Sequence, residues 1–118
     1  FVEATGVNAL AIAVGSAHGF YKETPNLQLD LIKEINSVTS AALVLHGSSG
    51  IPNEQLQAAI KNGITKINLA TEIKNIFMKS LQNELKCTSN IDLREVFPVA
   101  TLKATELVED KLRTISFQ

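Results

Sequence analysis

Two histidines stand at the ends of apolar runs, where their side chains could bind a metal. His18 lies in VGSAHGFY, shortly after the largely apolar residues 8–14. His46 lies in ALVLHGSSG, directly after the apolar residues 41–45. Asn68 lies near the end of a third predicted strand, TKINLA. Imidazole nitrogens are common ligands of zinc, and a carboxamide can donate a hydrogen bond to a substrate oxygen. Each histidine alone is also consistent with a structural, hydrogen-bonded residue, but the repeated placement favours a shared metal site.

Two segments beside these residues suit a phosphate group. Gly47, Ser48 and Ser49 offer backbone N–H groups with little obstruction and two hydroxyl groups. In NLATEI the chain passes directly from strand to helix, so the N–H groups near Ala70 and Thr71 would point out of a helix N-terminus that attracts anions. The alternatives are an ordinary turn for the first segment and a helix cap for the asparagine of the second.

Lys66 suggests a different chemistry, because a lysine in a barrel strand can form a Schiff base with a ketone. No apolar pocket around it is evident, and we expect its side chain to alternate away from Asn68. The acidic residues Glu23, Asp30 and Glu72 are expected on solvated loops or helix faces. None of them is a convincing acid for proton transfer.

Helical and strand patterns alternate along the chain, which is typical of an α/β protein with a parallel sheet. The continuous apolar run at residues 8–14 predicts a strand that is buried on both faces. In both parallel architectures, the barrel and the doubly wound sheet, ligands bind at the carboxyl ends of the strands. The expected elements are a helix end at residues 1–5 closed by Gly6, strands at 8–14, 41–45 and 65–70, and helices at 26–38, 52–63, 71–86 and 92–114, with Pro98 at a boundary or a kink.

Composition narrows the class of protein. The chain has 118 residues, 45% of them hydrophobic, a net charge of −1 and no linker, so we expect one domain at residues 1–118. Basic residues are scattered, which argues against nucleic acid as a partner. No run reaches the roughly 18 to 20 apolar residues of a membrane span, and residues 1–20 lack a basic leader, so we expect a cytoplasmic protein. Cys87 is the only cysteine, which excludes an internal disulfide.

Three stretches together resemble a known enzyme family. FVEATGVNALAIAVGSAHGFY, LVLHGSSG and GITKINLATEIK are similar to the carboxyl-terminal part of the class II, zinc-dependent ketose-bisphosphate aldolases. The NLATE form is closer to the tagatose-bisphosphate branch than to the fructose-bisphosphate branch, which has an aspartate at the position of Ala70. The resemblance implies that the three strands are the sixth to eighth of a (β/α)8 TIM barrel, whose first five strands lie outside these residues.

The resemblance also implies roles for individual residues. The cofactor would be Zn²⁺, or another divalent metal such as Co or Mn, and the enzyme would reversibly cleave a ketose 1,6-bisphosphate into dihydroxyacetone phosphate and glyceraldehyde 3-phosphate. The family's third metal histidine and its acidic proton-transfer residue would lie outside this chain. The implied metal ligands are His18 and His46, the implied dihydroxyacetone phosphate ligands are Gly19, Gly47, Ser48, Ser49, Asn68, Leu69, Ala70 and Thr71, and Asn68 would also stabilise the enediolate.

Two alternatives stay open at this point. A truncated, non-catalytic remnant could keep the phosphate loop and bind a sugar phosphate or a partner chain. A different metal-dependent lyase or epimerase could use the same barrel. For the full-length enzyme we expect a homo-oligomer, while these 118 residues alone would be inactive.

Overall fold

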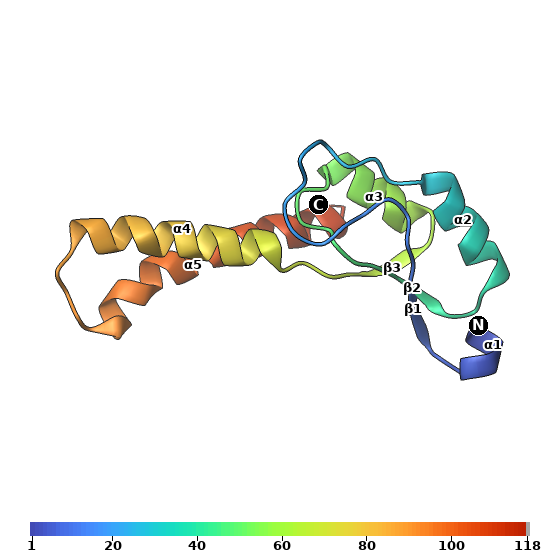
Figure 1. The fold of residues 1–118 in the computed structure, drawn as a ribbon, viewed down its shortest axis with the longest axis horizontal. Coiled ribbons are helices and arrows are strands. Elements are labelled where there is room, and N and C mark those ends of the chain that lie inside the picture. Colours follow the sequence, from blue (N-terminus) through green and yellow to red (C-terminus); the bar gives the residue numbers. More distant parts are fainter. Residues whose placement is uncertain (118) are drawn as a thin grey trace.

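The core of the protein is a three-stranded parallel sheet, seen in Figure 1. The computed structural model describes residues 1–117. The strands lie in sequence order, β1 (Ala9–Ala11), β2 (Ala42–Leu45) and β3 (Ile64–Ile67), and both neighbouring pairs are parallel. This arrangement confirms the α/β class and the parallel sheet.

Helices connect the strands and follow the last of them. α1 (Val2–Thr5) ends at Gly6, whose φ of 66° places it in the left-handed region, as predicted. α2 (Leu29–Val38) and α3 (Asn53–Lys61) are the two crossovers, and their apolar residues pack on the sheet around Leu43 and Leu45. No helix in the described part of the chain combines the length and apolarity that crossing a membrane requires.

The start of α2 differs from the prediction for a local reason. We expected this helix to begin at residue 26, but it begins at Leu29, after the N-cap Gln28. Gln55 on α3 holds this stretch, because its Oε1 accepts a hydrogen bond from the Leu27 N–H and its Nε2 donates to the Pro25 carbonyl, both at 2.9 Å. A helix that began at residue 26 would use the Pro25 carbonyl as an acceptor, but this carbonyl is bonded to Gln55 instead.

The prediction that the first strand is buried on both faces is wrong for this chain. β1 is only three residues long, and Ala9 and Ala11 are exposed while Leu10 is half-buried. The physical reason is its position at an edge of the sheet, where β2 is its only neighbour among the described residues.

The pairing of β2 with β3 contains an irregularity. Leu43 pairs with Ile64, but the next pair is Val44 with Lys66, so Thr65 is an extra residue on β3. Its hydroxyl donates to the Leu43 carbonyl at 3.1 Å. Because of this bulge, the residue opposite the end of β2 is one position later in the chain than in a regular pairing.

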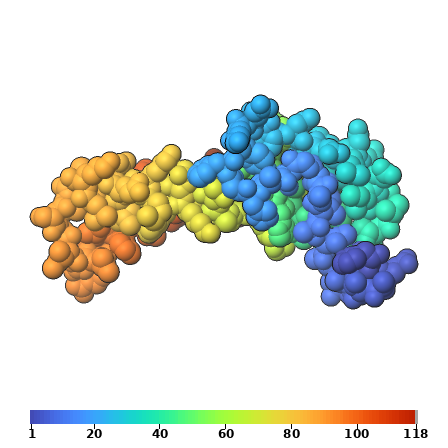
Figure 2. Space-filling model, viewed as in Figure 1, coloured from blue at the N-terminus to red at the C-terminus, as the bar shows by residue number. Residues whose placement is uncertain are grey.

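α4 (Thr71–Cys87) and α5 (Leu93–Ile115) form a helical hairpin, the arm, most of which projects from the sheet and is yellow to orange in Figures 1 and 2. The molecule measures 57 × 29 × 28 Å as a result. The end of α5, red in Figure 1, returns to α3. The arm has a small core of its own, made by Leu81, Val96 and Ala100 with Phe77 against it. α5 runs through Pro98, which is therefore inside the helix rather than at a boundary.

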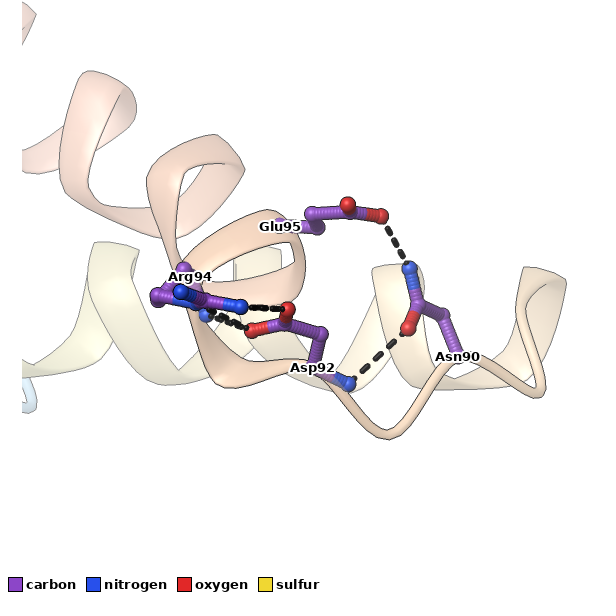
Figure 3. A network of polar contacts seen from close by, with 4 residues as sticks. All are labelled: Asn90, Asp92, Arg94 and Glu95. Atoms are coloured by element: carbon purple, nitrogen blue, oxygen red, sulfur yellow. Dashed lines mark hydrogen bonds and ion pairs between the residues drawn. The ribbon is translucent and has the colours of Figure 1, made fainter.

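A polar network closes the tip of the arm (Figure 3). Asp92 is the N-cap of α5, and its side chain accepts hydrogen bonds from the Arg94 backbone N–H and from the Arg94 guanidinium. Asn90 accepts from the Asp92 N–H at 2.9 Å and donates to Glu95 at 2.6 Å. The Asp92 side chain thereby satisfies the Arg94 N–H, one of the backbone groups that a helix start leaves without an intrahelical partner.

Candidate metal and phosphate site

His18 and His46 lie next to each other at the carboxyl ends of β1 and β2. His46 follows Leu45 directly, and the loop after β1 brings His18 back toward it. The ring centroids are 5.4 Å apart and the ring planes are inclined by 70°. Two imidazoles on one tetrahedral zinc have centroids about 5 Å apart, because each Zn–N bond is about 2.0–2.1 Å long. The pair therefore fits a shared metal.

These two residues supply fewer ligands than a catalytic zinc requires. Among residues 1–117 no group of three histidine, cysteine, aspartate or glutamate side chains is placed to hold a metal ion. Catalytic zinc sites usually have three protein ligands. A further ligand would have to come from residues outside this chain.

Asn68 meets His46 across the gap between β3 and β2. Its Nδ2 lies 3.1 Å from His46 Nε2, while its Oδ1 accepts a hydrogen bond from the Lys66 ammonium group. Since an ammonium group can only donate, Lys66 fixes the amide orientation, and Asn68 therefore donates to the ring nitrogen. The alternative role of Asn68 as the cap of α4 is wrong, because Ala70 is the N-cap and α4 has no side-chain cap.

The expectation that Lys66 points away from Asn68 is also wrong. Side chains two residues apart in a strand share a face, and the two side chains are in direct contact. Lys66 thus belongs to the same polar cluster as the asparagine and His46. It is exposed and lacks the apolar enclosure that is typical of Schiff-base lysines.

The loop after His46 presents backbone N–H groups. Within the described residues, the N–H groups of Ser48 and Ser49 have no protein acceptor, and neither has that of Thr71 at the start of α4. Gly47 has a φ of 63°, and a Cβ built there would lie 2.3 Å from the Ala17 carbonyl oxygen. Only glycine fits such a close approach.

The two serines of this loop differ in orientation. Ser48 is fully buried, and its hydroxyl donates to the Leu45 carbonyl at 3.2 Å. Ser49 Oγ accepts from the Glu72 backbone N–H at 3.2 Å, which leaves its own O–H free to donate. Of the two side chains, only that of Ser49 is therefore available to a ligand.

A pocket of about 460 Å³ lies beside this loop. Three of the predicted ligand residues line it, namely Gly19, Ser49 and Thr71. Lys22 also lines it and is the one cation there, a residue that sequence analysis missed. Its position in the sequence could have indicated this role, because Lys22 follows the AHG sequence in HGFYK, three residues after Gly19. A lysine beside free N–H groups suits an anionic ligand, and the carboxyl groups of Glu23 and Glu72 also line the pocket.

Glu72 is not the solvated residue that we expected. Its Oε1 accepts a hydrogen bond from the Gly50 N–H, and its Oε2 lies 3.4 Å from the Lys111 ammonium on α5. The Glu72 side chain is only 23% exposed. One residue of α4 therefore holds the end of the loop at two points, through Ser49 and Gly50, and Lys111 balances its charge.

The remaining predicted ligands lie at the edge of this arrangement. Leu69 lines a separate cavity of about 170 Å³ together with residues of α4 and α5, so its side chain faces away from the pocket. Ala70 is exposed at the N-cap of α4. Only their backbone groups could contact a ligand in the pocket.

Comparison with known proteins places the chain in a family. The family model of class-II fructose-bisphosphate aldolase matches residues 1–118, and the chain belongs to this family of lyases. The YdjI aldolase of Escherichia coli is 33% identical, with a TM-score of 0.71 over 92% of this chain and 40% of its own. A Coccidioides immitis protein, provisionally assigned as a fructose-1,6-biphosphate aldolase, is 26% identical, with a TM-score of 0.87 over 97% of this chain and 40% of its own.

The chain is thus about two fifths as long as these solved structures. Fructose-bisphosphate aldolase from Campylobacter jejuni is 18% identical with a TM-score of 0.75, and shows the same fold. The matched share agrees with a carboxyl-terminal part of such a protein.

Proposed function

We propose that these residues are the carboxyl-terminal part of a (β/α)8 barrel domain, contributing its sixth to eighth strands, in a metal-dependent ketose-bisphosphate aldolase. The family match over the whole chain supports this assignment, as does the two-fifths coverage of the aldolase structures. The three parallel strands with helices between them, and the polar residues at their carboxyl ends, agree with barrel enzymes.

The proposed reaction is the reversible cleavage of a ketose 1,6-bisphosphate, tagatose or fructose, to dihydroxyacetone phosphate and glyceraldehyde 3-phosphate. The observation that carries it is the pairing of His18 with His46, 5.4 Å between centroids, beside a pocket with free N–H groups. His18 and His46 would hold Zn²⁺ or another divalent metal. When bound, such a metal acts as a Lewis acid that polarises a ketone oxygen.

The other residues have roles that follow from their positions. The free N–H groups of the loop, the Ser49 hydroxyl, Thr71 and Lys22 would hold a phosphate group by charge-assisted hydrogen bonds. Gly19 lines the same pocket and leaves room for the anion. A phosphate fixed there would orient the remainder of the substrate toward the histidines.

Asn68 would act on the substrate oxygens. Its amide N–H donates to His46 Nε2. If His46 Nε2 held a metal instead, the Asn68 N–H group would be free. The released group could then donate to an oxygen on which negative charge develops during the reaction. Lys66 would keep the amide in the donating orientation, because it occupies Oδ1.

The test of the metal site is His46→Ala in the full-length protein. We expect it to lose stoichiometric zinc while its circular dichroism spectrum stays that of the parent. Gln82→Ala, on the exposed side of α4, is the control and should keep its zinc. Full zinc occupancy in the His46 variant would refute the assignment.

Substrate choice is tested with the same preparation. Retro-aldol assays on tagatose and fructose bisphosphates should both yield triose phosphates, with tagatose bisphosphate the preferred substrate. Zinc binding without cleavage of either ketose would favour another lyase or an epimerase on the same barrel.

A further inference from the structure

Tyr21 connects the two loops that carry the histidines. Its hydroxyl accepts a hydrogen bond from the Ala17 N–H and donates one to the Gly47 carbonyl, both at 2.7 Å. Ala17 immediately precedes His18, and Gly47 immediately follows His46. A single hydroxyl group thus bonds the residue next to His18 and the residue next to His46.

Little else in the backbone joins these loops. Among the described residues, no backbone hydrogen bond runs between residues 15–20 and residues 46–50. The loops nevertheless approach closely, since a Cβ at Gly47 would meet the Ala17 carbonyl oxygen at 2.3 Å. The Tyr21 hydroxyl supplies the polar link at the place where the two chains come together.

The position of this hydroxyl is set by the ring that carries it. Tyr21 is half-buried and packs against the main core cluster. A Cβ added at Gly50 would lie 3.3 Å from Tyr21 Cδ2, so the ring lies close against the loop after His46. A ring held on both sides gives its hydroxyl a defined place, and the two loops are then defined relative to it.

We propose that Tyr21 is a positioning residue for the metal ligands, which sets the distance and angle between His18 and His46. The inference rests on the metal site of the proposed function. Two nitrogens on one zinc must come to within about 3.3 Å of each other, given Zn–N bonds of about 2.0–2.1 Å. His18 lies on an exposed loop seven residues beyond the end of β1, so its place depends on contacts such as this one. Loss of the link would leave both ligands present but their spacing undefined.

The experiment is Tyr21→Phe in the full-length protein, with zinc affinity measured by competition against a chromophoric chelator. We expect affinity to fall about 10- to 100-fold, the usual effect of removing a partner behind a metal ligand. Thr114→Val is the matched control, because it deletes a buried hydroxyl that bonds the Asp110 carbonyl on α5. Its zinc affinity should equal that of the parent.

A purely structural role gives a different result. Tyr21→Phe would then unfold at a lower temperature but bind zinc with parental affinity at temperatures where circular dichroism shows it folded, and this outcome would overturn the proposal. Visible absorption of the cobalt-loaded protein is a second measurement, because its bands report ligand geometry. Unchanged bands in the Phe variant would also count against it.

The proposed function fails separately. If the parent protein binds no zinc, or if His46→Ala binds it equally well, the metal site itself is misassigned. If the parent binds zinc through His46 and Tyr21→Phe binds it just as tightly, only the role of Tyr21 is wrong.

Discussion

At the scale of single residues, the two serines of the loop Gly47, Ser48 and Ser49 face in different directions. Ser48 turns into the protein and bonds the end of β2, while Ser49 keeps a free hydroxyl beside the pocket. The sequence HGSSG predicts a loop suited to phosphate, but it cannot say which serine faces the ligand. That choice depends on Leu45 and Glu72, which lie outside the loop.

This difference leads to a prediction for two serine variants. Ser49→Ala in the full-length protein should weaken dihydroxyacetone phosphate binding by about 1.5–3 kcal/mol, because a hydrogen bond to a charged group is lost. Ser48→Ala, the matched control, should lower stability while leaving affinity almost unchanged. Calorimetric titration measures the affinity. Equal losses in the two variants would show that the orientations do not decide binding.

Part of the candidate site could be predicted from the sequence. His18, His46 and Asn68 each come at or after the end of a predicted strand, and parallel strands bring such positions to one edge of a sheet. The roles of the individual residues came from the family resemblance rather than from the pattern. Lys22 and Tyr21 were missed, since a lysine and a tyrosine in a loop look like surface residues until the folded partners are known.

At the scale of elements, the bulge at Thr65 decides which residue faces His46. With the extra residue, Leu45 pairs with Ile67, and Asn68 comes next beside His46. In a regular pairing that continued from Leu43 and Ile64, the residue beside His46 would be Ile67. An apolar run in the sequence does not reveal a bulge, because the bulge is a property of two paired strands.

The tip of the arm gives a prediction about pH. Hydrogen bonds from Arg94 lower the pKa of Asp92 below its usual value. A carboxyl group with a lowered pKa stabilises the fold above the pKa of its unfolded state, and this contribution is lost as pH falls through the folded value. Asp92→Ala should therefore speed amide exchange in the first turn of α5 at neutral pH but have no effect in strong acid.

Asp110→Ala is the control for this experiment, because Asp110 is an exposed aspartate of the same helix, far from its first turn. It should leave exchange in the first turn unchanged at every pH. A pH-independent effect of Asp92→Ala would show that the capping charge does not matter there. Exchange is followed by NMR or mass spectrometry.

At the scale of the whole molecule, the arm makes the chain unusually extended. Its radius of gyration is 17.6 Å, against about 13.5 Å for a compact domain of this length. Periodicity predicted both helices of the arm, yet not that they would pack mainly on each other. That outcome depends on what surrounds them, and apolar residues such as Phe97, Leu102 and Leu112 stay 40%, 56% and 55% exposed.

The exposed surfaces lead to a prediction for these 118 residues expressed alone. We expect no retro-aldol turnover at saturating zinc, because two histidines are one short of a catalytic zinc site, and because the family resemblance places the proton-transfer acid outside these residues. We also expect self-association, since both edge strands and the arm present unpaired or apolar surface.

Light scattering during gel filtration, with assays on the same fractions, tests both expectations. The full-length protein is the positive control for turnover. Cleavage of either ketose bisphosphate by a monomer of these residues would mean that an acid within the chain takes part, and Glu23 and Glu72 would be examined first.

The separate core of the arm has a consequence for folding cooperativity. The sheet with α2 and α3 encloses one apolar cluster, and Leu81, Val96 and Ala100 enclose another between α4 and α5. The bonds that join the arm to the rest of the chain lie at its base, where Glu72 in the first turn of α4 bonds Ser49 and Gly50, and Gln57 on α3 donates to the Thr114 carbonyl near the end of α5. Regions with independent apolar contacts open with independent free energies. The part of the arm beyond these bonds can then melt while the sheet and its histidine pair persist, and a single free energy of unfolding does not describe these 118 residues.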